Sequence, residues 1–165
     1  MIETDPLTGD VDQLRHVFGC FPSGVAAICA MVDGEPVGMA ASSFTSVSMK
    51  PPLVSVCVQN SSSTWPKLRE ASRLGVSLLA QDQGMECASL ARKNGDRFAE
   101  IAWRQNGSGG VLILGATAWL DCSIHQEVAA GDHAIILLRI HGVWSDSVAE
   151  PLVFHRSRLR RLVAM

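Results

Sequence analysis

The segment GMAASSFTSVSMKPPLVSV, residues 38–56, carries hydroxyl side chains at close intervals along one extended stretch of chain. Five of them precede a double proline: Ser42, Ser43, Thr45, Ser46 and Ser48. Small residues at Gly38, Ala40 and Ala41 leave room for a flat molecule to approach the backbone. The prolines remove two amide donors and end strand pairing, which leaves neighbouring main-chain groups free for a ligand. The pattern indicates a ligand-binding wall, and a serine-rich edge strand facing solvent explains the same periodicity equally well.

A second polar segment, QNSSSTW, precedes a predicted helix. Hydroxyls and unpaired amides at a helix start suit an anion, and the direct hydrogen bonds to a charged group contribute about 1.5–3 kcal/mol each. The helix dipole alone contributes about 0.3–1 kcal/mol, so direct donors would dominate phosphate binding. Ordinary helix capping explains the same residues without a ligand.

Composition excludes several classes of function. The formal net charge is −2 and the charges are interspersed, so we expect no nucleic-acid footprint and no membrane patch. The basic segment HRSRLRR is interpreted as a solvated tail, and the acidic N-terminus lacks the apolar core of a signal peptide. The apolar runs are shorter than the roughly 20 residues of a membrane-spanning helix. Five scattered cysteines without metal-ligand spacing favour buried thiols in a reducing, cytoplasmic environment.

Helices and strands must hold the two polar segments in position. A chain of 165 residues can bury one hydrophobic core, so we expect a single domain. Asp10 is expected to cap a helix that packs an apolar face (Leu14, Val17, Phe18 and Phe21) onto a sheet. The Asp33-Gly34 pair between two apolar runs predicts a two-residue type I′ hairpin.

The remaining elements follow from periodicity and turn residues. Strands are expected over 53–58, 73–80, 110–126, 132–145 and 151–155. Helices are expected over 61–72 and 82–94, the second closed by Asn94-Gly95, and a long loop over 96–110. The loop's NGSGG segment lacks the spacing of a dinucleotide-binding fingerprint. Consecutive strands joined by short turns predict a mainly β, small antiparallel barrel with short peripheral helices.

Six segments occur in the order that is typical of a known family: FPSGVAAICA, GMAASSFTSVSMKPPLVSVCV, SSSTW, DRFA, GDHAIILLRIHGV and PLVFHRSRLRRL. Over about residues 11–162 the chain resembles the short-chain flavin reductases that supply reduced flavin to two-component monooxygenases. The resemblance implies an FMN-binding split β-barrel of antiparallel Greek-key type, usually a homodimer. It also implies FMN or FAD as flavin and NADH or NADPH as reductant.

The same resemblance implies residue roles. The flavin ring and ribityl chain would meet Ala40, Ala41, Ser42 and Ser43, with Ser46, Val47 and Ser48 completing the wall. The phosphate would be held by Cys57, Val58, Gln59, Asn60, Ser63 and Thr64. His133 would lie where the nicotinamide arrives, and Phe98 would border the flavin. Phe154 would belong to the C-terminal side of the cofactor site. His155 and Arg156 would reach the dinucleotide phosphates, and a solvated chain end explains these two residues equally well.

Departures from the family leave other functions open. Relatives commonly carry tyrosine, glycine and tyrosine at the positions of Phe154, Ser157 and Leu159, and this chain contains no tyrosine. These three replacements put the affinity for the nicotinamide nucleotide in question more than the affinity for the flavin. Hydride transfer between nicotinamide C4 and flavin N5 needs no protein nucleophile, which agrees with the absence of a triad motif. The alternatives are a flavoprotein that retains its flavin and reduces another acceptor, such as ferric iron, and a flavin-binding module without turnover.

Overall fold

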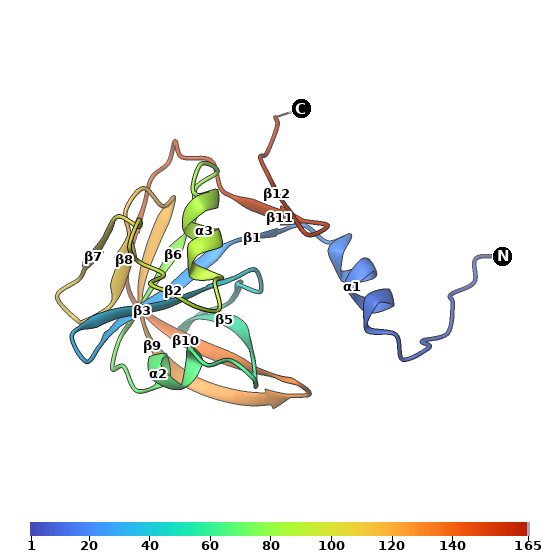
Figure 1. Cartoon of the computed structure of the whole chain (residues 1–165), viewed down its shortest axis with the longest axis horizontal. Coiled ribbons are helices and arrows are strands. Elements are labelled where there is room, and N and C mark those ends of the chain that lie inside the picture. The colour runs from blue at the N-terminus through green and yellow to red at the C-terminus, as the bar shows by residue number, and fades with distance from the viewer. Residues whose placement is uncertain (165) are drawn as a thin grey trace.

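The fold is built on an antiparallel sheet of seven strands, in the order β3-β2-β6-β9-β10-β5-β4 (Figure 1). In this computed structural model, which describes residues 1–164, the strands are β2 (Ala26–Val32), β3 (Glu35–Ala41), β4 (Thr45–Met49), β5 (Pro52–Gln59), β6 (Leu74–Leu78), β9 (Ala118–Ala130) and β10 (His133–Ser145). The sheet does not close, because β3 and β4 stand at its two ends. The predicted mainly β, antiparallel architecture is confirmed.

Two small sheets and three helices complete the described part of the chain. The small sheets contain β1 (Ser23–Gly24) with β11 (Val153–His155) and β12 (Arg158–Arg160), and β7 (Trp103–Gln105) with β8 (Val111–Ile113). The helices are α1 (Val11–Gly19), α2 (Trp65–Arg69) and α3 (Gly84–Leu90). Among residues 1–164, no helix is both long and apolar enough to cross a membrane.

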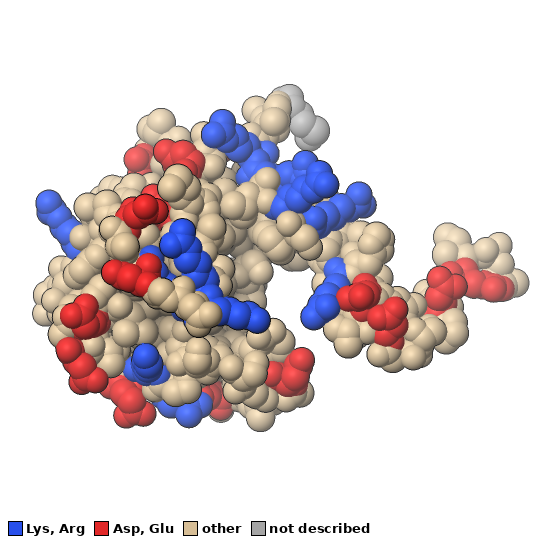
Figure 2. All heavy atoms as spheres, viewed as in Figure 1, with Lys and Arg blue, Asp and Glu red and all other residues tan. Residues whose placement is uncertain are grey.

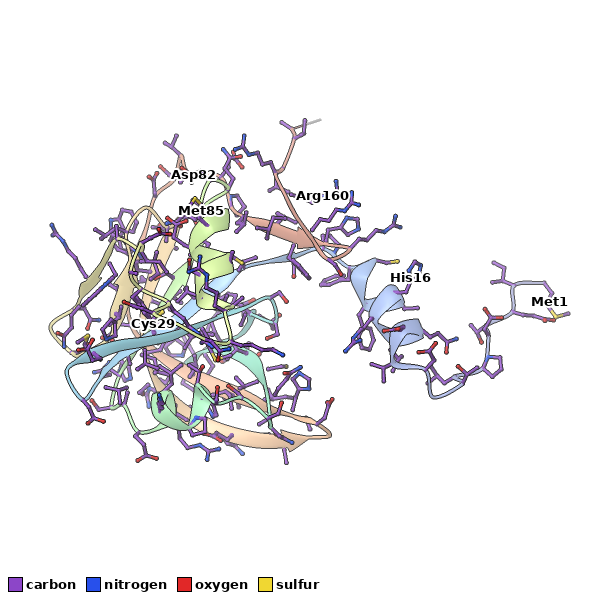
Figure 3. All side chains as sticks on the ribbon, in the orientation of Figure 1. Met1, His16, Cys29, Asp82, Met85 and Arg160 are labelled. Atoms are coloured by element: carbon purple, nitrogen blue, oxygen red, sulfur yellow. The ribbon has the colours of Figure 1, made fainter. Side chains whose placement is uncertain are left out.

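Strand β2 is buried on both faces, which explains its unbroken apolar sequence AAICA. Ala26 and Ile28 pack into one cluster with β5, β6, β10 and α2, whereas Ala27 and Cys29 pack into a second cluster. Alternate residues of a strand point to opposite faces, so each cluster receives every second side chain. Figure 3 shows Cys29 inside the body of the molecule.

The β2–β3 hairpin forms as predicted. Val32 pairs with Glu35, and the two residues between them, Asp33 and Gly34, have φ of 51° and 83°. Positive φ at both central residues is the geometry of a type I′ turn. The hairpin positions the end of β3, where the hydroxyl-rich segment begins.

Helix α1 is capped as predicted, since Asp10 Oδ1 accepts a hydrogen bond from the Asp12 amide at 2.9 Å. The predicted packing of its apolar face on the sheet is wrong. No residue of α1 is buried, and Phe18 and Phe21 are 69% and 78% exposed. Figure 1 shows the reason, because α1 projects away from the sheets and meets no other element along most of its length.

Four further expectations need correction. The predicted loop 96–110 contains β7, which pairs with β8, and the predicted strand 110–126 is divided between β8 and β9 by a turn at Gly115. Helix α3 ends at Leu90, before the predicted Asn94-Gly95 stop. The basic C-terminal segment is strand β12, which pairs with β11 through a turn at Arg156 and Ser157.

Candidate functional site

A groove of about 680 Å³ lies where β3 and β5 end and α2 begins. The end of β3, with Ala40 and Ala41, and the next two residues, Ser42 and Ser43, form one wall. The other lining residues are Met39, Cys57, Gln59, Ser61, Ser62, Ser63, Thr64, Leu90, Ala91, Lys93, Arg97 and His133. The groove therefore brings together nine of the residues singled out from the sequence, and it combines small side chains with neutral hydroxyl groups.

Strand alternation explains why β5 and β10 contribute side chains to this groove. Val56 and Val58 point into the core, so the intervening Cys57 and Gln59 point to the opposite face. His133 pairs with Gln59 across the β5–β10 ladder, which places it on the same face. The predicted proximity of His133 to the hydroxyl-rich wall thus follows from register.

Ser43 holds the wall in place. Its Oγ accepts a hydrogen bond from the Cys57 amide at 2.9 Å and donates one to the Cys57 carbonyl at 3.1 Å. The hydroxyl has a single proton, so its donor is engaged inside the protein. Ser42 Oγ makes no hydrogen bond within residues 1–164, and it is the wall hydroxyl that remains free for a ligand.

His133 is paired with its chain neighbour. Its Nδ1 lies 2.7 Å from Asp132 Oδ1, and the histidine side chain is 35% exposed. The hydrogen bond from His133, together with its charge, lowers the pKa of Asp132 below the usual value. The contact orients the imidazole and leaves Nε2 for another partner.

Arg97 and Lys93 supply positive charge at the α2 end of the groove. Arg97 Nη1 donates to the Gly38 carbonyl and to Thr64 Oγ1, both at 2.8 Å, so its guanidinium is fixed between β3 and α2. Gly38 is packed tightly there, because an added Cβ would collide with Cys29 Sγ and lie 2.9 Å from a Phe98 ring carbon. Neither Lys93 nor Arg97 was predicted as a site residue from the sequence, although Arg97 belongs to the family-typical segment DRFA.

The amides at the start of α2 are partly used by ordinary capping. Ser62 Oγ accepts hydrogen bonds from the Thr64 and Trp65 amides at 3.3 and 3.1 Å. Thr64 itself makes no side-chain capping bond, and its hydroxyl accepts from Arg97. With α2 only five residues long, the hydroxyls and the two cations contribute more to anion binding here than the helix does.

Several predicted residues do not line the groove. Val58 is 2% exposed in the core, and Asn60 Nδ2 donates to the Gly131 carbonyl at 3.1 Å. Ser46, Val47 and Ser48 lie on β4, at the open end of the sheet.

The three aromatic candidates lie elsewhere. Phe98 lines an adjoining cavity of about 400 Å³. Phe154 lines a third cavity of about 520 Å³, which also touches Ser42 and Ser43. His155 pairs with Arg158 on the β11–β12 ladder and lies outside the groove. Across the described chain, no group of three or more His, Cys, Asp or Glu side chains could hold a metal ion.

Comparisons with known proteins agree with this geometry. The family model described as "Flavin reductase like domain" matches residues 18–163. A flavin reductase of Pseudomonas putida is 38% identical over 148 residues, covering 89% of this chain and 87% of that protein. The reductase component of a flavin-dependent trigonelline monooxygenase of Acinetobacter baylyi is 36% identical, covering 84% of this chain and 45% of that longer protein.

The solved structures include a similar protein with ligands. It is the NADH:FAD oxidoreductase SgcE6 of Streptomyces globisporus C-1027 in complex with NAD and FAD fragments. Its TM-score with this chain is 0.90 at 36% identity, and the match covers 99% of this chain and 98% of that one.

Proposed function

Because this chain belongs to the flavin reductase like domain family, we propose that it is an NAD(P)H-dependent flavin reductase that passes hydride from a nicotinamide nucleotide to FMN or FAD. The observation that carries the proposal is the groove itself. It joins the Ala40–Ser43 wall, the α2 hydroxyls, two cations and His133 in one cavity.

The residues present fit a flavin. The groove has the size of a small-molecule site, since such pockets measure roughly 300–1,000 Å³. Ala40 and Ala41 are small enough for a planar ring to approach the backbone, and Ser42 offers a hydroxyl beside it. Lys93 and Arg97 lie at the α2 end, where a ribityl phosphate is neutralised best.

A flavin bound in the groove would supply the redox chemistry, in which NAD(P)H, a proton and oxidised flavin give NAD(P)⁺ and reduced flavin. The chain's own residues position the reactants. The wall fixed by Ser43 would present a rigid surface to the ring, and Arg97, fixed by Gly38 and Thr64, would hold the phosphate end. His133, oriented by Asp132, would offer Nε2 to the incoming nucleotide.

A steady-state panel tests this function directly. NADH and NADPH are each combined with riboflavin, FMN and FAD, and the loss of absorbance at 340 nm is followed. We expect at least one pair to support turnover that requires both the protein and the flavin. No protein-dependent loss in any of the six combinations would overturn the proposal.

The reduced flavin is proposed to serve a partner monooxygenase. Support comes from relatives whose names describe them as the reductase component of such a system. Anaerobic gel filtration after reduction separates this role from a retained-flavin enzyme, because a supplier releases its reduced flavin into the low-molecular-weight fractions. Co-elution of all the reduced flavin with the protein would contradict the role.

A homodimer is proposed as the working assembly. Its support is the apolar surface of α1 and the residues just after it, where Val17, Phe18 and Phe21 are each more than half exposed. The cavity between α1 and the body is lined by Phe18, Phe21, Phe44 and Phe154, and a second copy would cover it. Light scattering should give twice the chain mass, and Phe18→Asp should give the monomer. The control Val148→Asp, at another exposed apolar residue, should stay dimeric.

We also propose that the protein works in the cytoplasm. All five cysteines are unpaired. The expectation of buried thiols is wrong for Cys20 and Cys57, which are exposed. Free exposed thiols persist best in a reducing compartment, where the nicotinamide reductant is also made. Fractionation with a compartment marker is the direct check, and recovery with a secreted marker would contradict it.

A further inference from the structure

The turn between β9 and β10 leads directly into His133. Ala130 pairs with His133, so the turn has two central residues, Gly131 and Asp132. Gly131 has φ of 66°, which is typical of the first central residue of a type II′ turn. Both central residues are exposed, and the turn is the free end of the orange hairpin in Figure 1, where Figure 2 shows acidic side-chain atoms at the surface. Exposed turns are among the more mobile parts of a fold unless other residues hold them.

Asn60 holds this turn from the end of β5. Its amide donates to the Asp132 carbonyl at 2.9 Å, and its side-chain Nδ2 donates to the Gly131 carbonyl at 3.1 Å. Asn60 is itself part of a tight turn, in which the Ser62 amide donates to the Gln59 carbonyl at 3.0 Å. One residue therefore binds the carbonyls of both central residues of the β9–β10 turn.

The connection continues from the turn to the imidazole. Asp132 Oδ1 lies 2.7 Å from His133 Nδ1, and the Asp132 side chain is 94% exposed. Because packing does not hold so exposed a carboxylate, its position depends on the backbone that carries it. The two carbonyls bound by Asn60 belong to the peptide groups on either side of Asp132. Asn60 thus fixes the backbone from which Asp132 reaches the histidine.

We propose that Asn60 is a positioning residue for the nicotinamide nucleotide, which acts through the turn and Asp132 to hold the His133 imidazole in the groove. This inference rests on the proposed function. The resemblance to the family implied that Asn60 holds the flavin phosphate. Asn60 does not line the groove, however, and its Nδ2 is bound to Gly131. Its influence on the site therefore passes through the turn.

Steady-state kinetics and flavin binding of wild type, Asn60→Ala, His133→Ala and the double variant test this role. Asn60→Ala should lower kcat/KM for NADH or NADPH by about three- to tenfold, the loss expected for one hydrogen bond between neutral groups. The flavin dissociation constant, measured by flavin fluorescence, should stay within about twofold of wild type, because Asn60 lies outside the groove. In the His133→Ala background, Asn60→Ala should cause no further loss, because the two residues act through one contact.

Two further variants separate the Asn60 side chain from general effects of substitution. Asn60→Asp keeps the size and the backbone amide of the residue and removes the Nδ2 donor, so it should lower kcat/KM as Asn60→Ala does. Gln126→Ala is the matched control, because Gln126 is an exposed amide residue on β9, outside the turn and the groove. It should behave as wild type.

Three results would overturn the positioning role and leave the proposed function standing. Unchanged nucleotide kinetics in both Asn60 variants would show that the turn does not need this residue. Additive losses in the double variant would show that Asn60 does not act through His133. Weaker flavin binding at unchanged nucleotide kinetics would assign Asn60 to the flavin phosphate. A wild-type protein that turns over no pair of nucleotide and flavin would contradict the proposed function itself.

Discussion

Ser43 and Cys57 are joined by two hydrogen bonds, in which the serine hydroxyl accepts from the Cys57 amide and donates to the Cys57 carbonyl. The pair ties the segment between β3 and β4 to β5 on the face that carries the groove. The Ser43 hydroxyl, which the sequence suggested as a ligand contact, therefore stabilises the wall of the groove instead. Its neighbour Ser42 makes no hydrogen bond through its hydroxyl within residues 1–164, so that group is available to the proposed flavin.

Ser43→Ala should lower the free energy of unfolding by about 1–2 kcal/mol, because two backbone groups of Cys57 lose their partner. Flavin affinity should fall with it, since the wall loses its attachment. Ser42→Ala is the matched control and should leave stability within about 0.5 kcal/mol of wild type. Urea unfolding of the three proteins gives the comparison. Equal stabilities for both variants would show that the Ser43 contact does not hold the wall.

His133→Ala should reduce kcat/KM for the nicotinamide nucleotide by about 10- to 100-fold, the loss expected for a hydrogen bond of about 1.5–3 kcal/mol. Flavin affinity should change by less than threefold, because ring and phosphate are held elsewhere in the groove. His125→Ala, at an exposed histidine on β9, is the control and should behave as wild type. A His133 variant with unchanged nucleotide kinetics would remove this residue from the site.

The hydrogen bond between His133 and Asp132 predicts how the Asp132 carboxylate affects nucleotide kinetics at different pH values. His133 lowers the pKa of Asp132, so that carboxylate stays ionised throughout the pH range 6–8. As pH falls through the lowered pKa, the carboxylate protonates and this support for the histidine is lost. Asp132→Asn should therefore lower kcat/KM for the nicotinamide nucleotide at neutral pH, where the carboxylate is ionised. Unchanged nucleotide kinetics in this variant would show that the carboxylate does not support His133.

Cysteine labelling gives a test of the groove that needs no turnover. Cys57 lines the groove and is exposed, and Cys20 is exposed at the end of α1. Burial raises the pKa of both Cys29 and Cys122 to about 12, so these thiols stay protonated and unreactive in the folded protein at pH 8. Iodoacetamide followed by mass spectrometry should label Cys20 and Cys57 first.

Bound flavin should then protect Cys57 and leave Cys20 reactive. Urea should expose Cys29 and Cys122 to the same reagent, which serves as the internal control for burial. Equal labelling of Cys57 with and without saturating flavin would place the flavin away from this groove.

The turn between β11 and β12 carries a cost that a single substitution can remove. Ser157 has φ of 59°, in the left-handed region where residues with a Cβ are less stable by about 1–2 kcal/mol. Glycine has no such penalty. Ser157→Gly should raise the free energy of unfolding by about 0.5–1 kcal/mol, after the larger entropy of the unfolded glycine chain is included. Ser157→Ala keeps the Cβ and should show no gain, so equal stabilisation by both variants would contradict the strain.

Local signals allowed much of the fold to be predicted. Asp33-Gly34 specified a hairpin because both residues tolerate positive φ, and the apolar run LVSVCV predicted the buried strand that the structure has as β5. The pairing of β7 with β8 escaped prediction, since each strand has only three residues and their partners are set by tertiary contacts. The prediction that α1 packs on the sheet was wrong because an apolar helix face indicates only that the face is covered. It does not tell whether the same chain or another molecule covers it.

The site could be predicted less completely than the fold. The Ala40–Ser43 wall and His133 were found because their segments are distinctive in residue type and order. Arg97 and Lys93 were missed because a basic residue in a polar loop usually faces solvent, and only the fold brings them to the groove. The basic segment beyond Phe154 was taken for a tail, although it forms β12, and Figure 3 places Arg160 on the outer side of that strand.

The central claim is that this groove brings a nicotinamide nucleotide and a flavin together for hydride transfer. An anaerobic single-turnover experiment tests it most directly: protein, oxidised flavin and a limiting amount of NADH or NADPH are mixed, and absorbance is followed at 340 and 450 nm. The account predicts that one flavin is bleached for each nucleotide oxidised, at a rate that His133→Ala lowers and His125→Ala does not. Nucleotide and flavin that both keep their absorbance, for every pair tried, would contradict it.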